Sequence, residues 1–353
     1  MKRKQFIEHS MPTIGRAEKE AVAAVLRTRF LAEGRFVKTF EEAVTDRVGC
    51  LGAVATSTGT LALHLALVAL GVERGSEVLL PSYACRSLLN AVAYCGAVPV
   101  VCDVDEHDFN LSFAQAKKKL TRRTKAVIVA HMFGCPAEID RFKALGVPVI
   151  EDCAHSIGAE YKGRPVGSWG DCAVFSFQGT KYIVAGEGGM VVANSALLLE
   201  RLRKLKEPDS SDVGVKYTYR MTDLQAAIGR AQLKQLKGFI QARVKIASIY
   251  RDAFSDLDIA LPYSSAGGKH IFHRFMIRVK GDIHSFMRQC YAHGVKVKQT
   301  IKPLSIHQYL RLPGKDFPVT EMIMRSVLSV PIYPSLNKQQ VLRIIEAVRA
   351  AAC

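Results

Sequence analysis

Short apolar segments alternate with longer helical patterns between about residue 50 and residue 195. Most of these segments are apolar at consecutive positions, as in strands of a parallel sheet that is covered by helices on both faces. We therefore predict an α/β fold with a mainly parallel, mixed sheet. The predicted strands are 54–56, 77–80, 98–102, 126–130, 147–152, 172–177 and 189–193, and the first two helices between them are 60–70 and 87–94.

The pattern changes in the second half of the chain. A long helix is predicted over 221–252, with Gly238 as the one candidate for an interruption, and the polar stretch 207–212 before it is predicted to be a loop. A smaller mixed unit follows, with strands predicted at 270–279 and 295–298 and helices at 283–293 and 338–352. These patterns predict a large domain with an N-terminal arm at 1–240 and a small C-terminal α+β domain at 241–353.

Composition limits the class of protein. No apolar run approaches the roughly 20 residues that cross a bilayer, and no apolar segment follows the basic N-terminus, so neither a membrane span nor a signal peptide is expected. The nine cysteines contain no C-x-x-C pair, and several lie in apolar strands. Free thiols in a reducing compartment explain them better than disulfides do, which predicts a cytoplasmic protein.

The chain is strongly basic, with 49 Lys and Arg against 32 Asp and Glu and a formal net charge of +17. This excess could attract nucleic acid, or it could draw a small anionic substrate into a cleft. No helix-turn-helix, zinc-finger or RNA-binding signature is present, and solvated helix faces explain most of the basic clusters. Nucleic acid is therefore an unlikely partner.

Two residues in adjoining segments suggest a cofactor. Lys181 lies between an apolar strand and a Gly-rich turn, where burial lowers the pKa of an amine and makes it a nucleophile toward an aldehyde. Asp152 ends a predicted buried strand, and ligands of such sheets lie at the carboxyl ends of the strands. Pyridoxal phosphate requires a lysine for its aldehyde and a carboxylate for its ring nitrogen. An ordinary surface lysine and a turn-capping aspartate are the competing interpretations.

Six segments carry a family resemblance, namely 40–42, 57–67, 151–155, 175–189, 219–227 and 328–334. In this order they resemble the DegT/DnrJ/EryC1/StrS family of sugar aminotransferases, and the resemblance covers nearly the whole chain. It implies the aspartate aminotransferase fold, which is fold type I of the pyridoxal phosphate-dependent enzymes. It also implies transfer of an amino group from glutamate or glutamine to a nucleotide-linked keto sugar, by a homodimer with shared active sites.

The resemblance assigns roles to three residues around the cofactor ring. Lys181 would bind the cofactor aldehyde in the resting enzyme, and its free amine would then carry a proton from the α-carbon of the donor. Asp152 would keep the pyridine nitrogen protonated. His155 matches a position at which relatives place a glutamine or histidine close to the ring, although a lone histidine near a core is more often merely hydrogen-bonded.

The resemblance also implies a phosphate site. Gly59 and Thr60 open a helix whose N-terminal amides would bind the phosphate, and Ser176 would add a hydroxyl. The alternatives are a simple N-cap for the helix and an ordinary serine in a sheet.

Three positions differ from the family pattern. Cys85 stands where many relatives have an aromatic residue over the ring, so Tyr83 is considered as a substitute for it. Thr218 stands where relatives have an asparagine that reaches the phosphate across the dimer interface, and 300–301 replace a His-Tyr pair. The last difference suggests an altered sugar site.

Two other functions compete with transamination. One is an elimination or dehydration of a sugar on the same scaffold, but the dehydratase branch of the family carries histidine where this chain keeps Lys181. The other is a non-catalytic, basic protein that binds nucleic acid and has kept the fold, since fold alone does not establish activity.

Overall fold

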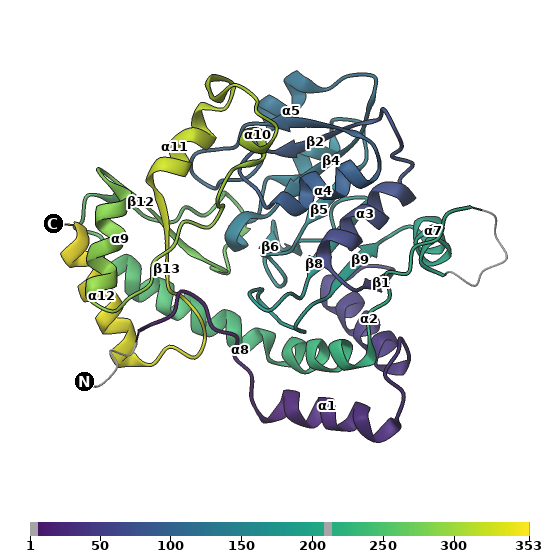
Figure 1. The fold of residues 1–353 in the computed structure, drawn as a ribbon, viewed down its shortest axis with the longest axis horizontal. Helices are drawn as coiled ribbons and strands as arrows, with labels where there is room; N and C mark the ends of the chain where they lie inside the picture. The colour runs from purple at the N-terminus through teal and green to yellow at the C-terminus, as the bar shows by residue number, and fades with distance from the viewer. Residues whose placement is uncertain (1–5, 208–213, 353) are drawn as a thin grey trace.

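The main sheet confirms the predicted α/β class. The computed structural model describes residues 6–207 and 214–352, and in this part of the chain seven strands form the sheet in the order β1-β9-β8-β5-β4-β2-β3. Strand β9 is antiparallel to both of its neighbours, and the other adjoining pairs are parallel (Figure 1). The strands are β1 (Gly52–Thr56), β2 (Glu77–Pro81), β3 (Val98–Cys102), β4 (Thr124–Ala130), β5 (Val149–Asp152), β8 (Cys172–Ser176) and β9 (Gly189–Ala193).

Both faces of this sheet are covered, which explains why its strands are apolar at consecutive positions. In β4, Val127 and Val129 belong to one hydrophobic cluster, whereas Ala126 and Ile128 belong to the other. Because side chains alternate between the faces of a strand, each cluster fills one side of the sheet. The first cluster includes residues of α2 (Arg35–Val48), α5 (Phe113–Lys119), α6 (Ile139–Lys143) and α8 (Asp223–Ala253), and the second includes residues of α3 (Gly59–Ala69), α4 (Arg86–Tyr94) and α7 (Ala196–Lys206).

The long helix α8 is continuous, so the expected interruption at Gly238 is wrong. Thr222 and Gln225 form a capping box at its start. Gly238 lies on the outer side, where a Cβ would meet nothing within 4 Å. A glycine there costs only about 1 kcal/mol, and the buried residues on either side, Leu236 and Phe239, hold the helix in place. Helix α1 (Arg16–Thr28) packs along α8 (Figure 1).

The C-terminal part has its own three-stranded antiparallel sheet, β10 (Ile259–Ala260), β12 (Phe275–Val279) and β13 (Val327–Val330), packed with α9 (Ile283–Ala292) and α12 (Lys338–Ala352). The prediction of strand 270–279 was too long at its start, and β13 was not predicted. Residues 295–298 make only isolated bridges, Ile7 to Val295 and Lys298 to Ser329, so the strand predicted there is wrong. The other elements are β6 (Glu160–Tyr161), β7 (Arg164–Pro165), β11 (Gly268–Lys269), α10 (Ile306–Tyr309), α11 (Pro318–Ser326) and two 3-10 turns, Met132–Gly134 and Gly314–Asp316.

Helix α8 passes residue 240 without a break, and its second half packs in the C-terminal hydrophobic cluster. The same cluster includes Ile7 from the N-terminal arm. The division at 240 remains our proposal, with α8 as an element common to both domains. Residues 208–212 of the predicted loop lie outside the described residues, and no described helix is long and apolar enough to cross a membrane.

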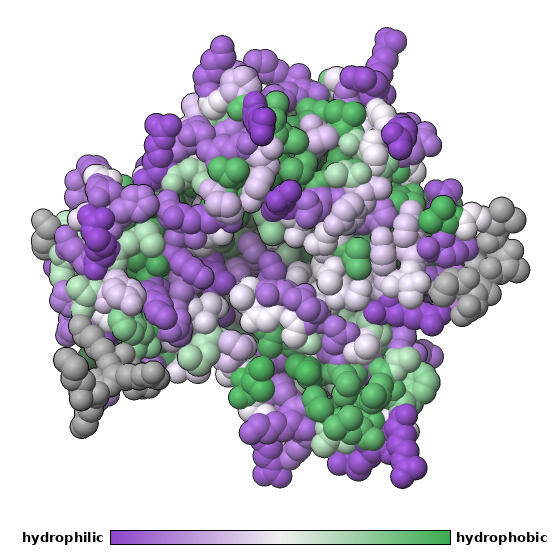
Figure 2. Space-filling view, viewed as in Figure 1, coloured by the Kyte–Doolittle hydropathy of each residue, from purple (hydrophilic) through white to green (hydrophobic). Residues whose placement is uncertain are grey.

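The sheet determines where a site can form. Strands β1, β2, β4, β5 and β8 all point the same way, so the segments that follow them meet at one edge of the sheet. Ligands of open α/β sheets bind outside such carboxyl ends. Figure 2 shows that the molecule is hollowed near the centre of the face in view.

Candidate functional site

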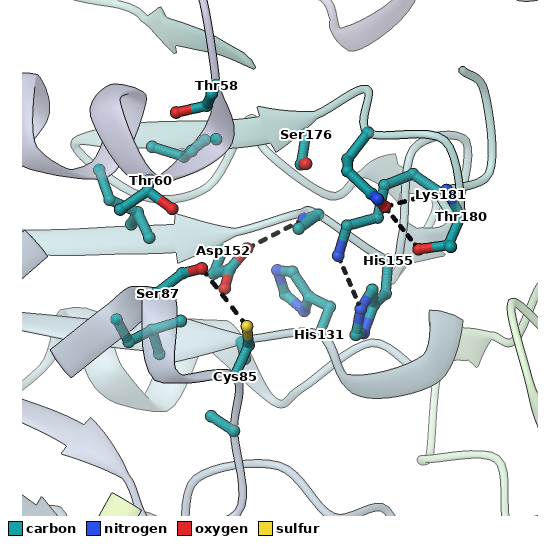
Figure 3. Close-up of a pocket in the computed structure, with 18 of the residues that line it drawn as sticks. Thr58, Thr60, Cys85, Ser87, His131, Asp152, His155, Ser176, Thr180 and Lys181 are labelled. Atoms are coloured by element: carbon teal, nitrogen blue, oxygen red, sulfur yellow. Dashed lines mark hydrogen bonds between the residues drawn. The ribbon is translucent and has the colours of Figure 1, made fainter. Parts of the chain in front are cut away.

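A cavity of about 370 Å³ opens at this edge of the sheet. Seven of the eight site residues predicted from the sequence line it, and they come from five different segments (Figure 3). These residues are Gly59, Thr60, Cys85, Asp152, His155, Ser176 and Lys181.

Lys181 lies in the loop between β8 and β9. Backbone hydrogen bonds close this loop, from Phe177 N–H to Gly188 O at 2.9 Å and from Gly179 N–H to Gly186 O at 2.9 Å. The Lys181 Nζ lies 3.1 Å from His155 Nε2. Burial lowers the pKa of Lys181, and the charge of Asp152 opposes this effect only in part. The amine is therefore easier to deprotonate than an exposed lysine.

His155 is held as a neutral ring. Burial lowers its pKa well below the usual value, and the charge of Lys181 lowers it further. The ring is stacked on His273, with centroids 4.6 Å apart, and on Phe133 at 5.8 Å. A neutral imidazole can accept a hydrogen bond from an ammonium group, so His155 can orient the Lys181 amine.

Asp152 is the last residue of β5 and faces the same cavity. Its Oδ1 accepts a hydrogen bond of 3.0 Å from the Ala154 amide. Burial raises the pKa of this carboxyl group, although the Ala154 amide and the charge of Lys181 act in the opposite direction. A carboxylate in such a position gains most from a cationic partner, such as a protonated ring nitrogen.

The N-terminus of α3 forms the other end of the cavity. The Thr58 side chain caps the helix by accepting a hydrogen bond from the Leu61 amide at 3.2 Å. The amides of Gly59 and Thr60 precede the first intrahelical donor, so the helix offers them no carbonyl partner. A Cβ on Gly59 would lie 2.8 Å from the Cβ of Ser176, so only glycine allows this approach of helix to strand. Both the helix end and the serine hydroxyl are suited to a phosphate.

Pyridoxal phosphate fits these groups. The amine, the carboxylate and the helix N-terminus are the partners that its aldehyde, ring nitrogen and phosphate need, and they line one cavity.

Cys85 and Tyr83 differ in their exposure and in their position relative to the cavity. Cys85 is exposed and lines the cavity, with its Sγ 3.3 Å from the Ser87 Oγ. Tyr83 is 2% exposed, and its hydroxyl lies 3.2 Å from Thr300 Oγ1. Tyr83 is not among the residues that line the cavity, so the structure gives no support to its use in place of an aromatic residue at position 85.

Thr218 is the predicted site residue that the cavity of its own chain does not include. It is exposed, and the neighbouring Tyr219 carbonyl accepts a hydrogen bond of 3.0 Å from Ser57 N–H. The segment thus lies beside the turn that precedes α3. Its predicted contact across a dimer interface remains a prediction.

The cavity also includes residues that the sequence analysis missed, namely Ser87, His131, Gln178, Thr180 and Glu187. The strand pattern could have identified His131, because it directly follows the predicted strand 126–130. The remaining residues carry no comparable signal.

His131, at the wall of the cavity, forms a buried pair with Glu151 behind it, with Nε2 and Oε2 2.9 Å apart. His131, Glu151 and Cys153 are close enough together to suggest a metal site. However, His131 Nδ1 already accepts a hydrogen bond from the Ala137 amide, and Glu151 accepts three more from the amides of Gly167, Trp169 and Gly170. Burial alone would raise the pKa of Glu151, but these hydrogen bonds lower it below its usual value. The pair is best explained as a structural support for β5.

Comparison with known proteins agrees with this geometry. The model of the DegT/DnrJ/EryC1/StrS aminotransferase family matches residues 12–349. The GDP-perosamine synthase of Caulobacter vibrioides is 34% identical over 361 residues, covering 97% of each chain. The structure of S. venezuelae DesV in complex with a ketimine intermediate has a TM-score of 0.90 and is 32% identical, covering 95% of this chain and 94% of that chain.

A further solved structure, DesI in the presence of its TDP-sugar product, has a TM-score of 0.90 and 28% identity, and covers 99% of this chain and 93% of that chain. The resemblance predicted from the sequence is therefore confirmed. The chain belongs to the DegT/DnrJ/EryC1/StrS family of pyridoxal phosphate-dependent sugar aminotransferases.

Proposed function

We propose that this sugar aminotransferase moves an amino group from glutamate or glutamine to a keto sugar that is carried on a nucleotide. The observation that carries the proposal is the arrangement of the cavity: an amine of lowered pKa, a neutral imidazole, a carboxylate and a helix N-terminus face one space. When bound, pyridoxal phosphate would supply the electron-withdrawing ring that stabilises a carbanion at the donor.

The residues of this chain would then have separate tasks. Lys181 would hold the cofactor and, once displaced by the donor, its Nζ would take the proton from the α-carbon of the donor. His155, 3.1 Å away, would orient that amine. Asp152 would keep a proton on the ring nitrogen, and the amides at the start of α3 would hold the phosphate together with Ser176.

The nucleotide part of the acceptor is supported by charge and by the relatives. A net charge of +17 favours anionic substrates. GDP-perosamine synthase is named for a product on a nucleotide, and DesI was solved with a TDP-sugar. Arginine and lysine bind such diphosphates directly.

This proposal can be tested by incubating the cofactor-loaded protein with keto sugars linked to GDP, TDP or UDP, each with glutamate or glutamine. The expected result is an amino sugar of the corresponding mass together with the matching keto acid, both detected by mass spectrometry. Loss of water from the sugar without gain of nitrogen would instead indicate elimination. Turnover only with free sugars would reject the nucleotide-linked acceptor.

We further propose that the enzyme is a homodimer and works in the cytoplasm. Apolar side chains gather around α1 (Figure 2), where Leu26 and Phe30 are 54% and 53% exposed, which supports contact with a second chain. The eight described cysteines have free thiols, which supports a reducing compartment.

Arg220 provides a test of the dimer. Its Nη2 lies 2.8 Å from Glu207 Oε1, whereas the alternative partner Asp223 is buried and instead accepts hydrogen bonds from the amides of Gly34 and Val37. If segment 218–221 reaches the phosphate of the other subunit, Arg220→Glu reverses a charge beside both an interface and a dianion. Because a two-fold interface repeats the change, we expect at least about tenfold weaker association and weaker cofactor retention.

Sedimentation at micromolar concentration and cofactor titration would measure both effects. Arg288→Glu is the control, because Arg288 is 71% exposed and its Nη2 lies 3.6 Å from Asp282 Oδ2. A native monomer that retains the cofactor would reject the shared site. A dimer that Arg220→Glu leaves intact would reject only the role of this segment.

A further inference from the structure

A buried arginine lies beside the cavity, and the part of the chain that the structure describes offers it no counter-charge. Arg274 precedes β12 and is 8% exposed. Its Nη2 makes one weak contact, 3.5 Å from the carbonyl oxygen of Thr180, which lines the cavity next to Lys181. Its Nη1 is buried and has no hydrogen-bond partner among the described residues. Within the same residues, no carboxylate lies within 4.0 Å of the guanidinium.

The charge of Arg274 acts on the Lys181 amine and on the imidazoles of His9, His155 and His273. Its charge lowers the pKa values of Lys181, His155 and His273, after the larger effect of burial on each. Burial lowers the pKa of Arg274 itself to about 9, with the charge of Arg243 as the next cause. His273 also has an unpartnered buried atom, Nδ1.

The neighbouring Arg243 has an evident structural role, in contrast to Arg274. Its Nη1 donates to the carbonyl oxygens of His273 and Ile332 at 3.2 and 2.5 Å, and its guanidinium lies over the Tyr182 ring at 4.8 Å. A buried guanidinium that lacks such partners destabilises the folded chain. This cost is offset only if an anion binds beside it.

We propose that Arg274 recognises the α-carboxylate of the amino-acid donor and so determines donor specificity. The inference rests on the proposed function, because it takes the donor to be an amino acid. The α-carboxylate is bonded to the same carbon as the amino nitrogen that replaces Lys181 Nζ, so it must lie close to that lysine. Arg243 also has no carboxylate partner among the described residues, but its Nη1 donates to two carbonyl oxygens, whereas the Nη1 of Arg274 has no acceptor there. Arg274 is therefore the guanidinium beside this part of the cavity that is free to bind a carboxylate. The phosphate site at α3 is formed by other residues, so the two anions would not compete.

A comparison of two donors isolates this contact. L-glutamate and 4-aminobutyrate differ by the α-carboxylate alone. In Arg274→Met, kcat/KM for L-glutamate is expected to fall roughly 10- to 150-fold, as for a lost hydrogen bond to a charged group. The kcat/KM for 4-aminobutyrate should stay within about twofold of the wild-type value. The ratio of kcat/KM for L-glutamate to kcat/KM for 4-aminobutyrate therefore falls. Arg274→Lys keeps the positive charge but lacks the planar guanidinium that donates two parallel hydrogen bonds to a carboxylate, so it should recover part of this ratio.

The control is Arg278→Met, four residues later and in β12, where the guanidinium binds Glu106 at 3.0 Å on the surface. It should leave the donor ratio unchanged. Calorimetric binding of glutarate provides a readout without turnover, and it should weaken by a similar factor in Arg274→Met but not in Arg278→Met.

An unchanged donor ratio and unchanged glutarate affinity in Arg274→Met would overturn the proposal, as would equal losses for both donors. A variant that loses affinity for GDP or UDP instead would assign Arg274 to the acceptor. If Arg274→Met does not fold, Arg274→Lys provides the test. A donor ratio equal to that of the wild type in Arg274→Lys would contradict recognition of the carboxylate by the guanidinium group. Failure of the wild type to use any amino acid would reject the proposed function, whereas glutarate binding would still test Arg274.

Discussion

Lys181→Ala is expected to reduce transamination by at least about 10³-fold while leaving the fold intact, because one change removes both the cofactor attachment and the proton-transfer group. The lysine is half-buried in a loop held by backbone hydrogen bonds, and among the described residues its side chain makes a hydrogen bond only with His155. Removing it therefore breaks little of the packing. Borohydride should fix the cofactor covalently to the wild-type protein at Lys181, and not to the variant.

Turnover, circular dichroism and peptide mapping after borohydride reduction would check this prediction. Lys280→Ala is the matched control, because that side chain is 78% exposed and pairs with Asp258 on the surface. A cofactor adduct on another lysine, or wild-type turnover in Lys181→Ala, would remove Lys181 from the mechanism.

Asp152→Asn is expected to lose about 10²- to 10³-fold of the turnover, since an amide cannot stabilise a protonated ring nitrogen as a carboxylate does. The side chain does little else to hold the fold, because the one hydrogen bond that it makes with the described residues comes from the Ala154 amide. The expected defect is therefore in kcat, with weaker cofactor binding and a normal circular dichroism spectrum. Turnover near that of the wild type would contradict the proposed role.

The same variant should stabilise the cofactor-free protein at neutral pH. Burial raises the pKa of Asp152 in the folded state, so deprotonation costs more there than in the unfolded chain. This loss of folding stability is absent below the unfolded pKa of about 3.9. It grows as the pH rises above that value and is complete above the raised pKa of the folded state. Thermal unfolding of the cofactor-free proteins should therefore show a higher Tm for Asp152→Asn at pH 7 and a difference that vanishes near pH 3. A lower Tm at pH 7 would show that the carboxylate is needed for stability.

The sequence determined most of the main sheet because six of its seven strands are largely buried on both faces, and the edge strand β3 is still apolar at consecutive positions. Residues 98–102 and 189–193 were predicted with the bounds that β3 and β9 have. The pattern was less informative in the C-terminal part. Residues 295–298 look like a strand, but they make only isolated bridges, and β13 pairs along β12 instead. Whether an apolar segment joins a sheet depends on the strand with which it pairs, and that strand can lie far away in the sequence.

The sequence by itself also determined the chemical groups of the site. Lys181 follows a strand and precedes a Gly-rich turn, and Asp152 ends a strand. Both could therefore be predicted as site residues before their positions in space were known. Only the tertiary structure decided which groups surround them. The 3.1 Å contact between Lys181 and His155 exists because β5 and β8 are neighbours in the sheet. Arg274 lies beside the cavity because the C-terminal part contacts the loop after β8 at Thr180. That it lacks a carboxylate partner among the described residues could be seen only in the structure, since burial and pairing depend on contacts between distant segments.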